Sequence, residues 1–365
     1  MLSPQLEELI MSSRSEAMLS SKAGVRFARL LTSTRASPLI TRRGLLSGCI
    51  PLLVAPQVGR GQSAMTLRRV GWLSLGTDAT VAELGAAFKQ GLRDLGWLEG
   101  KNVEYRIVYA NGNEGRLDAL ARELVGQQVE VILVGNGQSA RAAQRSTKTI
   151  PIVMAGLANA VDAGLVGSLA RPEGNITGLT SQHVEVLGKV IGLMHEVVPE
   201  ARRIAILLND GNPSYAGYWA SAQEACAALN LVALRVVASS PAQLGAAVEE
   251  IVRQRSQAVV VMGDAMYFTE RARFQRLMET TRLPVAHELR DLAIAGGLFS
   301  YGYDAAVNYR NAAKYVDKIL RGAKPRDLPV EQATKFDLVI NLKTAKVLGL
   351  TIPHSVLVRA DEVIQ

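Results

Sequence analysis

Residues 131–140 have the sequence VILVGNGQSA, and their pattern indicates the fold class. Its first four residues are all apolar, which is typical of a strand covered on both faces in a parallel sheet. The glycines and polar residues after them predict a tight turn that opens a helix. We therefore expect a buried strand over Val131–Val134 and a helix over Gln138–Arg145.

The same alternation continues on both sides of this stretch, from Arg68 towards the C-terminus. Short β-rich runs precede longer amphipathic runs, so the sequence predicts a series of βαβ units with right-handed crossovers. Within this series we expect a helix over Asp162–Leu169. A turn-rich segment at Arg171–Asn175 interrupts the alternation, which restarts at Ala201. The break predicts two lobes with a hinge near Thr177–Ser181.

Charge and composition exclude several classes of protein. Residues 1–65 hold eight basic and three acidic residues, so they carry +5 of the formal net charge of +8. The other residues carry a net charge of +3, with basic and acidic residues interspersed, and such a charge distribution does not indicate DNA binding. Aromatic residues make up 5% of the chain, which argues against a stacking wall for single-stranded nucleic acid. Two cysteines, Cys49 and Cys226, and four scattered histidines predict neither a disulfide framework nor a metal site.

Residues 1–65 are predicted to be an N-terminal extension and export signal. An arginine pair, Arg42-Arg43, precedes the short apolar stretch Gly44–Ala55, and small and polar residues follow. The apolar stretch is too short to span a bilayer as a helix. The arginine pair and its neighbours resemble the twin-arginine motif, and cleavage is expected near Gly61–Ala64. Alternatives are a lipoprotein box ending at Cys49 and an amphipathic or disordered tail of a cytosolic protein.

Ligands of open parallel sheets bind beyond the carboxyl ends of the strands, so the residues after each predicted strand are candidate site residues. In the first half these are Ser74 and Gly76, and then Asn136, Gly137 and Ser139. The free N–H groups at the start of the helix after Asn136 suit an anion such as a carboxylate. The same segment matches a weak dinucleotide fingerprint, but no acidic residue follows the next strand to hold a ribose. A simple tight turn is the alternative.

In the second half, Asn209, Asn212 and Ser214 follow one predicted strand and precede a helix. They provide hydrogen bonds to a ligand or, alternatively, form a turn and a helix N-cap. Asp264 follows another apolar strand, where a carboxylate suits a ligand ammonium, and capping the next helix is its alternative role. The sequence shows no G-x-S-x-G elbow, catalytic triad or carboxylate pair, so we expect no enzyme and no cofactor.

Several blocks, in one order, resemble the substrate-binding proteins of a large bacterial ABC-transporter family. The best-understood relatives in that family bind tryptophan and other aromatic amino acids. The blocks are GLRDLGW at 91–97, EGKNV at 99–103, TIPIV at 149–153, GLVGSLARP at 164–172, GNITG at 174–178, LVINL at 338–342, GLTIP at 349–353 and RADEVI at 359–364. The resemblance covers nearly all of residues 68–365.

The resemblance implies a type I periplasmic-binding-protein fold, in which two Rossmann-like lobes with parallel sheets are joined by a three-crossover hinge. It places the first lobe at 66–179 and 302–329, and the second at 180–301 and 330–365. The cleft positions that it implies are Ser74, Gly76, Asn136, Gly137, Ser139, Asn159, Thr180, Ser181 and Gln182, and then Asn209, Asn212, Ser214, Asp264, Tyr301 and Gly302. This chain departs from the family at Asn159-Ala160, where Asp-Pro is common, and at Asn136, where Thr or Ala is common.

The resemblance also implies an exported, monomeric receptor in the periplasm. Such a receptor captures a small solute, for example an amino acid or a related carboxylate, for an ABC permease and its ATPase subunit in the inner membrane. We expect no nucleic-acid partner, no cofactor and no metal. Three alternatives share the fold: a ligand-sensing transcription regulator, a receptor domain for signalling, and an enzyme on doubly wound lobes. The first needs an N-terminal helix-turn-helix, which residues 1–65 do not show.

Overall fold

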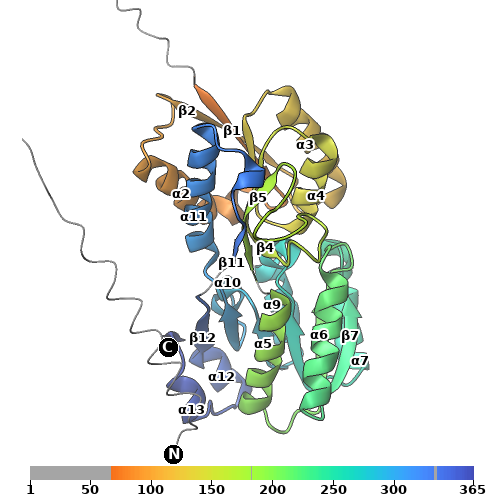
Figure 1. Cartoon of the computed structure of the whole chain (residues 1–365). Coiled ribbons are helices and arrows are strands. Elements are labelled where there is room, and N and C mark those ends of the chain that lie inside the picture. Colours follow the sequence, from red (N-terminus) through yellow and green to blue (C-terminus); the bar gives the residue numbers. More distant parts are fainter. Residues whose placement is uncertain (1–66, 182, 333–334) are drawn as a thin grey trace, which may run out of the picture. The chain divides into compact units, whose positions relative to one another are not determined.

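The computed structural model describes residues 67–181, 183–332 and 335–365, and its strands form two sheets (Figure 1). The predicted export signal and Gln182 therefore lie outside the described residues. Strands and helices alternate along the chain, and each sheet carries its own helices. The predicted α/β class with two lobes is confirmed. We call the part built on the first sheet the first lobe and the part built on the second sheet the second lobe.

The first sheet has six parallel strands in the order β11-β5-β4-β3-β1-β2. Their bounds are β1 Arg68–Ser74, β2 Val103–Tyr109, β3 Val131–Val134, β4 Ile152–Ala158, β5 Ile176–Ser181 and β11 Glu331–Gln332. β3, the apolar strand Val131–Val134, lies between β1 and β4, and none of its four side chains is exposed to solvent. Its unbroken apolar sequence follows from this position, because neighbouring strands and helices on both faces exclude water.

Helices cover both faces of the first sheet (Figure 1). α2 packs against α11 on one face, and α3 packs against α4 on the other. Their bounds are α2 Asp78–Asp94, α3 Leu117–Gly126, α4 Gly137–Ser146 and α11 Ala305–Leu320. Each face buries its own apolar cluster, with Phe88 in one and Leu124 in the other. Burial of this apolar surface, at about 25 cal/mol per Å², is the main force that holds the lobe together.

The second sheet has seven strands in the order β13-β12-β10-β9-β8-β6-β7, and all neighbours are parallel except β10 and β12. The strands are β6 Arg203–Leu208, β7 Val232–Val237, β8 Ala258–Val261, β9 Val285–His287, β10 Phe299–Gly302, β12 Asp337–Asn341 and β13 Glu362–Ile364. The helices are α5 His183–Val197, α6 Tyr215–Ala228, α7 Leu244–Arg253, α8 Ala265–Thr269, α9 Arg271–Glu279, α10 Arg290–Ile294, α12 Leu342–Leu348 and α13 His354–Leu357. α5 packs against α6, and α7 packs against α9.

The chain passes between the two sheets three times: after β5, after β10 and after β11. The short strand β11 pairs with β5 in the first sheet, although the predicted division assigned residues from 330 onward to the second lobe. Thr180 and Ser181 likewise lie in β5 of the first sheet, and Gly302 ends β10 of the second. The structure thus places each passage a few residues away from the predicted lobe boundaries.

The helix predicted over Asp162–Leu169 does not form, so that prediction is wrong. The segment is a series of turns, in which the Gly164 N–H donates to the carbonyl of Val161. Gly164 has a φ of +65°, a left-handed conformation that ends helices and that glycine adopts readily. Apolar spacing therefore overestimated helix formation here, because two glycines, Gly164 and Gly167, lower the helix propensity of a short segment.

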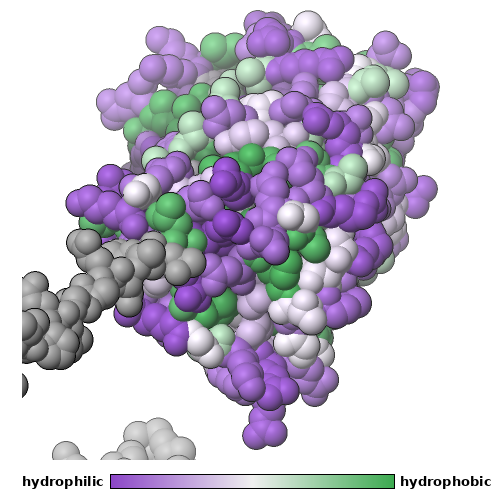
Figure 2. Space-filling view, turned by 90° about the horizontal axis from the view of Figure 1, so that it is seen from above, coloured by the Kyte–Doolittle hydropathy of each residue, from purple (hydrophilic) through white to green (hydrophobic). Residues whose placement is uncertain are grey.

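The side turned to the viewer in Figure 2 is mostly hydrophilic, and its hydrophobic residues form small separate patches of the kind found on ordinary protein surfaces. No helix within residues 67–181, 183–332 and 335–365 is long and apolar enough to cross a membrane.

Candidate functional site

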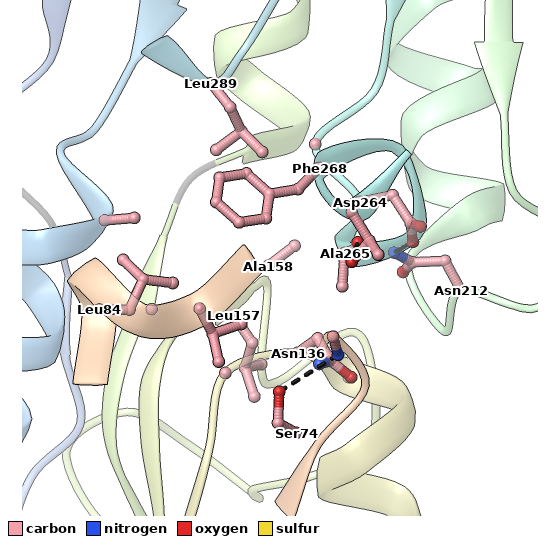
Figure 3. Close-up of a pocket in the computed structure, with 18 of the residues that line it drawn as sticks. Ser74, Leu84, Asn136, Leu157, Ala158, Asn212, Asp264, Ala265, Phe268 and Leu289 are labelled. Carbon is pink, nitrogen blue, oxygen red and sulfur yellow. Dashed lines mark hydrogen bonds between the residues drawn. The ribbon is translucent and has the colours of Figure 1, made fainter. Parts of the chain in front are cut away.

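A cavity of about 90 Å³ lies between the two lobes, where strand ends of both sheets meet (Figure 3). The first lobe lines it with residues that end or follow β1, β3 and β4, and the second with residues that follow β6 and β8. Small-molecule sites commonly form at such domain interfaces and strand ends. Seven of the residues predicted from the sequence line the cavity: Ser74, Gly76, Asn136, Gly137, Asn212, Ser214 and Asp264.

The first lobe provides hydrogen-bonding groups at one end of the cavity. Ser74 ends β1, and its Oγ accepts a hydrogen bond of 3.2 Å from the Gly76 N–H (Figure 3). Asn136 is the N-cap of α4, and its Oδ1 accepts a hydrogen bond of 2.8 Å from the Ser139 N–H. The first N–H groups of the helix, beginning with Gly137, have no intrahelical carbonyl partner. Together with the positive end of the helix dipole, they suit an anionic oxygen.

Asp264 of the second lobe lies at the same polar end, only 3% exposed, and it is the N-cap of α8. Its Oδ1 accepts hydrogen bonds from the Met266 N–H at 2.8 Å and from Asn209 Nδ2 at 3.1 Å. Its Oδ2 accepts from Asn212 Nδ2 at 2.8 Å and from Gln138 Nε2 at 3.1 Å. A carboxylate offers about four acceptor sites, so these donors occupy all of them. A ligand ammonium at Asp264 therefore has to share or replace one of the four, and that role stays a prediction.

Apolar side chains of both lobes also line the cavity. Leu84 of α2 and Leu157 of β4 come from the first lobe, and Phe268 of α8 and Leu289 after β9 come from the second. In Figure 3, Phe268 and Leu289 lie on the far side of the cavity from Ser74. The cavity thus has a polar end and an apolar end, so it suits a ligand with a polar head and an apolar side chain.

Two tyrosines complete the lining beside α11. Tyr309 belongs to α11, and its ring packs against Trp72 with the ring centroids 5.4 Å apart. Tyr303 Oη donates a hydrogen bond of 2.8 Å to the carbonyl of Gly156. Burial raises the pKa of both phenols, so at neutral pH they are uncharged hydrogen-bonding groups.

The lining of the cavity carries little charge. Asp264 is its one acidic side chain, and none of the described residues that line it is a lysine, arginine or histidine. A bound carboxylate therefore relies on backbone N–H groups and the dipole of α4 rather than on a cation. This arrangement favours a ligand without net negative charge, such as a zwitterion, over a dianion.

Some of the predicted residues stabilise the backbone beside the cavity instead of lining it. Thr180 Oγ1 donates a hydrogen bond of 2.9 Å to the carbonyl of Leu157, and Ser181 Oγ donates one of 3.3 Å to the same carbonyl. Asn159 has a φ of +38°, and its side chain donates to Asp162. These contacts hold the end of β4, where Gly156, Leu157 and Ala158 line the cavity.

The remaining predicted residues lie farther from the lining. Ser139 is fully buried in the first turn of α4, and Asn209 is fully buried as a donor to Asp264. Tyr301 stacks on Phe336 with the ring centroids 6.1 Å apart, and the two rings line a separate hollow on the second lobe.

Sequence reasoning missed the apolar and aromatic lining, which comprises Val81, Leu84, Leu157, Phe268, Leu289, Tyr303 and Tyr309. The predicted residues directly follow strands, whereas most of these side chains come from helices or from positions farther along the chain. One signal was available: Phe268 lies four residues after Asp264, which is one helical turn beyond the predicted cap.

The described residues bring together no group of three or more His, Cys, Asp or Glu side chains that could hold a metal ion. The cavity lining provides hydrogen-bond donors, one carboxylate and an apolar wall. These groups can bind a small organic molecule through hydrogen bonds and apolar contacts.

Comparisons with known proteins agree with this geometry. A conserved domain protein from Vibrio cholerae has a similar structure, with a TM-score of 0.77, 27% identity, and coverage of 81% of this chain and 99% of that one. A Streptococcus pneumoniae ABC domain in complex with L-Trp has a TM-score of 0.77 at 22% identity, covering 82% of this chain and 100% of that one. A curated relative, the tyrosine-binding protein of Clostridioides difficile, is 24% identical over 263 residues, which are 72% of this chain and 75% of the relative.

The two lobes, with the cavity between them, have the type I periplasmic-binding-protein fold. The sequence profile of the ABC transporter substrate binding proteins matches residues 77–364, and the chain belongs to this family. Its members are receptors rather than enzymes, and they bind a small molecule outside the cytoplasm for an ABC transporter. The family that the sequence blocks indicated is therefore confirmed.

Proposed function

We propose that this chain is a periplasmic receptor for an amino acid with an apolar side chain, which it delivers to an ABC importer. The observation that carries the proposal is the cavity itself, with helix N–H groups at one end and an apolar wall at the other. Two of the similar proteins support the ligand class, because one is named a tyrosine-binding protein and another was crystallised with L-Trp.

Each part of the ligand has a place in this proposal. The carboxylate binds the free N–H groups at the start of α4, around Gly137. The ammonium lies at Asp264, where it takes the place of one of the four present donors. The side chain lies against Leu84, Phe268 and Leu289. The absence of a cationic side chain from the described lining agrees with a ligand whose own ammonium balances its carboxylate.

The size of the cavity fits one small molecule. A single water needs about 10–15 Å³ of such space, so 90 Å³ corresponds to roughly six to nine waters. We propose that the lobes open and close about the three passages between the sheets, which come after β5, β10 and β11. Opening is needed for entry, because the lobes already contact each other: Ser214 Oγ of the second lobe donates to the carbonyl of Ala158 in the first, at 3.3 Å.

The finer parts of the proposal rest on the sequence. The arginine pair Arg42-Arg43 supports export by the twin-arginine route, and the low net charge after residue 65 supports a receptor without a nucleic-acid partner. We take the receptor to be monomeric and without catalytic activity.

The test is thermal unfolding of the protein from Met65 onward with a panel of ligands. The panel holds aromatic and branched-chain amino acids, the same molecules without the amino group, dicarboxylates and sugars. A ligand at a hundred times its dissociation constant adds about 2.7 kcal/mol of stability. For a two-lobed chain of this size that raises the melting temperature by roughly 5 °C or more.

We expect a rise with one or more apolar amino acids and none with dicarboxylates. A rise with sugars or dicarboxylates alone would contradict the proposed ligand class. The variant Phe268→Ala tests the role of the apolar wall. It should reduce the rise in melting temperature with large amino acids more than the rise with alanine.

A further inference from the structure

A cluster of polar side chains beside the cavity, three of them buried and Glu114 half-buried, connects the two lobes. Glu114 and Gln138 belong to the first lobe, in the turn Glu114–Arg116 and in α4, and Asn209 and Asp264 follow β6 and β8 of the second. Gln138 and Asp264 are 6% and 3% exposed, and Asn209 is fully buried. We call these four residues the interlobe cluster.

Two amide groups bridge two carboxylates in this cluster. Gln138 Nε2 donates to Asp264 Oδ2 and to Glu114 Oε1, each at 3.1 Å. Asn209 Nδ2 donates to Asp264 Oδ1 at 3.1 Å and to Glu114 Oε1 at 3.4 Å. Each amide thus reaches one carboxylate of its own lobe and one of the opposite lobe. Separation of the lobes breaks the hydrogen bonds from Gln138 to Asp264 and from Asn209 to Glu114.

The charges in the cluster do not balance. Both acids are carboxylates, and both bridging groups are neutral amides. The charge effects on Glu114 from the second lobe come from Asp264 and Asp210, which are both acidic. Within its own turn, Arg116 directs a guanidinium N–H to the carbonyl of Ala110 instead. Closing the lobes therefore brings carboxyl groups of opposite lobes together, and no cationic side chain of the described residues is among the charges that act on Glu114.

We propose that the interlobe cluster is a proton-dependent latch: Glu114 takes up a proton when the lobes close, and deprotonation of Glu114 favours the open form. This goes beyond the proposed function, because the latch acts on closure whichever ligand the cavity takes.

The direction of the effect follows from burial and charge. In the closed structure, burial first and the charges of Asp264 and Asp210 in addition raise the pKa of Glu114 above its ordinary value of 4.5. This outweighs the hydrogen bonds from Asn209 and Gln138, which lower the pKa. In the open form Glu114 faces water, and its pKa returns towards that value. The closed form therefore binds the proton more tightly, and closure is favoured as the pH falls. As the pH rises above about 4.5, the ratio of closed to open molecules falls, by at most tenfold per pH unit for one proton.

The test measures lobe closure without any ligand, so that its result does not depend on the proposed function. Fluorescent donor and acceptor dyes are attached to cysteines at two exposed positions, Arg122→Cys on α3 and Val252→Cys on α7. The full chain carries Cys49→Ser, and the buried Cys226 stays in place. Energy transfer is then recorded between pH 4 and pH 8.

Three further variants make the result specific. Glu114→Gln keeps the shape and the hydrogen bonds but cannot lose a proton, so we expect its closure to be independent of pH. Glu83→Gln, at an exposed position on α2, should retain the pH dependence of the parent. Gln138→Ala removes one bridge and should shift the population towards the open form at every pH. Circular dichroism and chemical unfolding verify that each variant is folded.

Two results would overturn the proposal. One is a parent protein whose closure does not change between pH 4 and pH 8. The other is a Glu114→Gln variant that is folded and keeps the full pH dependence. A ligand panel that finds no amino acid would leave this measurement unaffected, so failure of the latch and failure of the proposed function are distinguishable.

Discussion

The side chain of Tyr309 occupies the space that a Cβ atom on residue 135 would need, and Gly135 stands there. Tyr309 comes from α11, which follows the second passage of the chain between the sheets, whereas Gly135 directly follows β3. Both residues line the cavity. Residue 135, directly after β3, therefore has to be glycine, because the side chain of Tyr309, from a distant part of the sequence, leaves no room for a Cβ atom.

The first prediction follows from this contact. Gly135→Ala should displace Tyr309 and lower the free energy of unfolding by about 1–3 kcal/mol, the usual cost of overpacking a buried site. It should also weaken ligand binding, because Tyr309 lines the cavity. Chemical unfolding measures the first effect, and titration with a ligand from the panel measures the second.

A matched control is Gly192→Ala in the middle of α5, where a new Cβ meets no atom within 4 Å. That substitution should leave stability unchanged or raise it by about 0.5–1 kcal/mol. Equal effects of the two substitutions would contradict the role assigned to the contact with Tyr309.

The second prediction separates two roles of Asp264. Asp264→Ala removes the acceptor of four hydrogen bonds, and of the four donors only Gln138 and Asn209 keep a second acceptor, Glu114. The substitution should therefore lower both stability and ligand affinity, the latter by at least tenfold. If Asp264 also binds a ligand ammonium, the parent should bind an amino acid much more tightly than its analogue without the amino group. The variant should then lose most of that preference. Calorimetric titration of both ligands into both proteins gives the comparison, and a preference retained by a folded variant would assign Asp264 a structural role alone.

The sequence predicted the lobed α/β architecture well, and the reason is physical. Strands such as Val131–Val134 are covered on both faces, and an unbroken apolar run of that length has few other stable positions. The helix predicted over Asp162–Leu169 failed because apolar spacing carries no information on backbone conformation, which Gly164 sets locally with a φ of +65°. Local patterns therefore predicted regular elements better than irregular turns.

The candidate site was predicted in part for a related reason. Strand ends of a parallel sheet meet at one edge, so Ser74, Asn136 and Asp264 could be brought together from the sequence alone. Leu84, Phe268 and their apolar neighbours could not, because an apolar residue on a helix looks the same whether it faces a core or a ligand cavity. The bridges from Gln138 and Asn209 depend on how the two lobes meet, which no local pattern contains.

The third prediction concerns His287, which is 1% exposed at the end of β9. Neither ring nitrogen has a hydrogen-bond partner among the described residues, and the ring packs edge-on against Phe274 with the centroids 6.3 Å apart. Burial lowers the pKa of His287 from 6.5 to about 3. The unfolded chain therefore binds a proton between those values, whereas the folded chain does not.

It follows that stability should fall as the pH falls from about 6.5 towards 3, by at most roughly 5 kcal/mol from this group. Urea unfolding at pH 7, 5.5 and 4.5 measures the slope. His287→Leu removes the titrating group and should flatten the slope, even if it changes the stability at pH 7. His354→Gln replaces an exposed histidine and serves as the control, which should follow the parent at every pH. If His287→Leu keeps the parent's slope over this range, the loss of stability in acid comes from other groups and the buried neutral imidazole is not its cause.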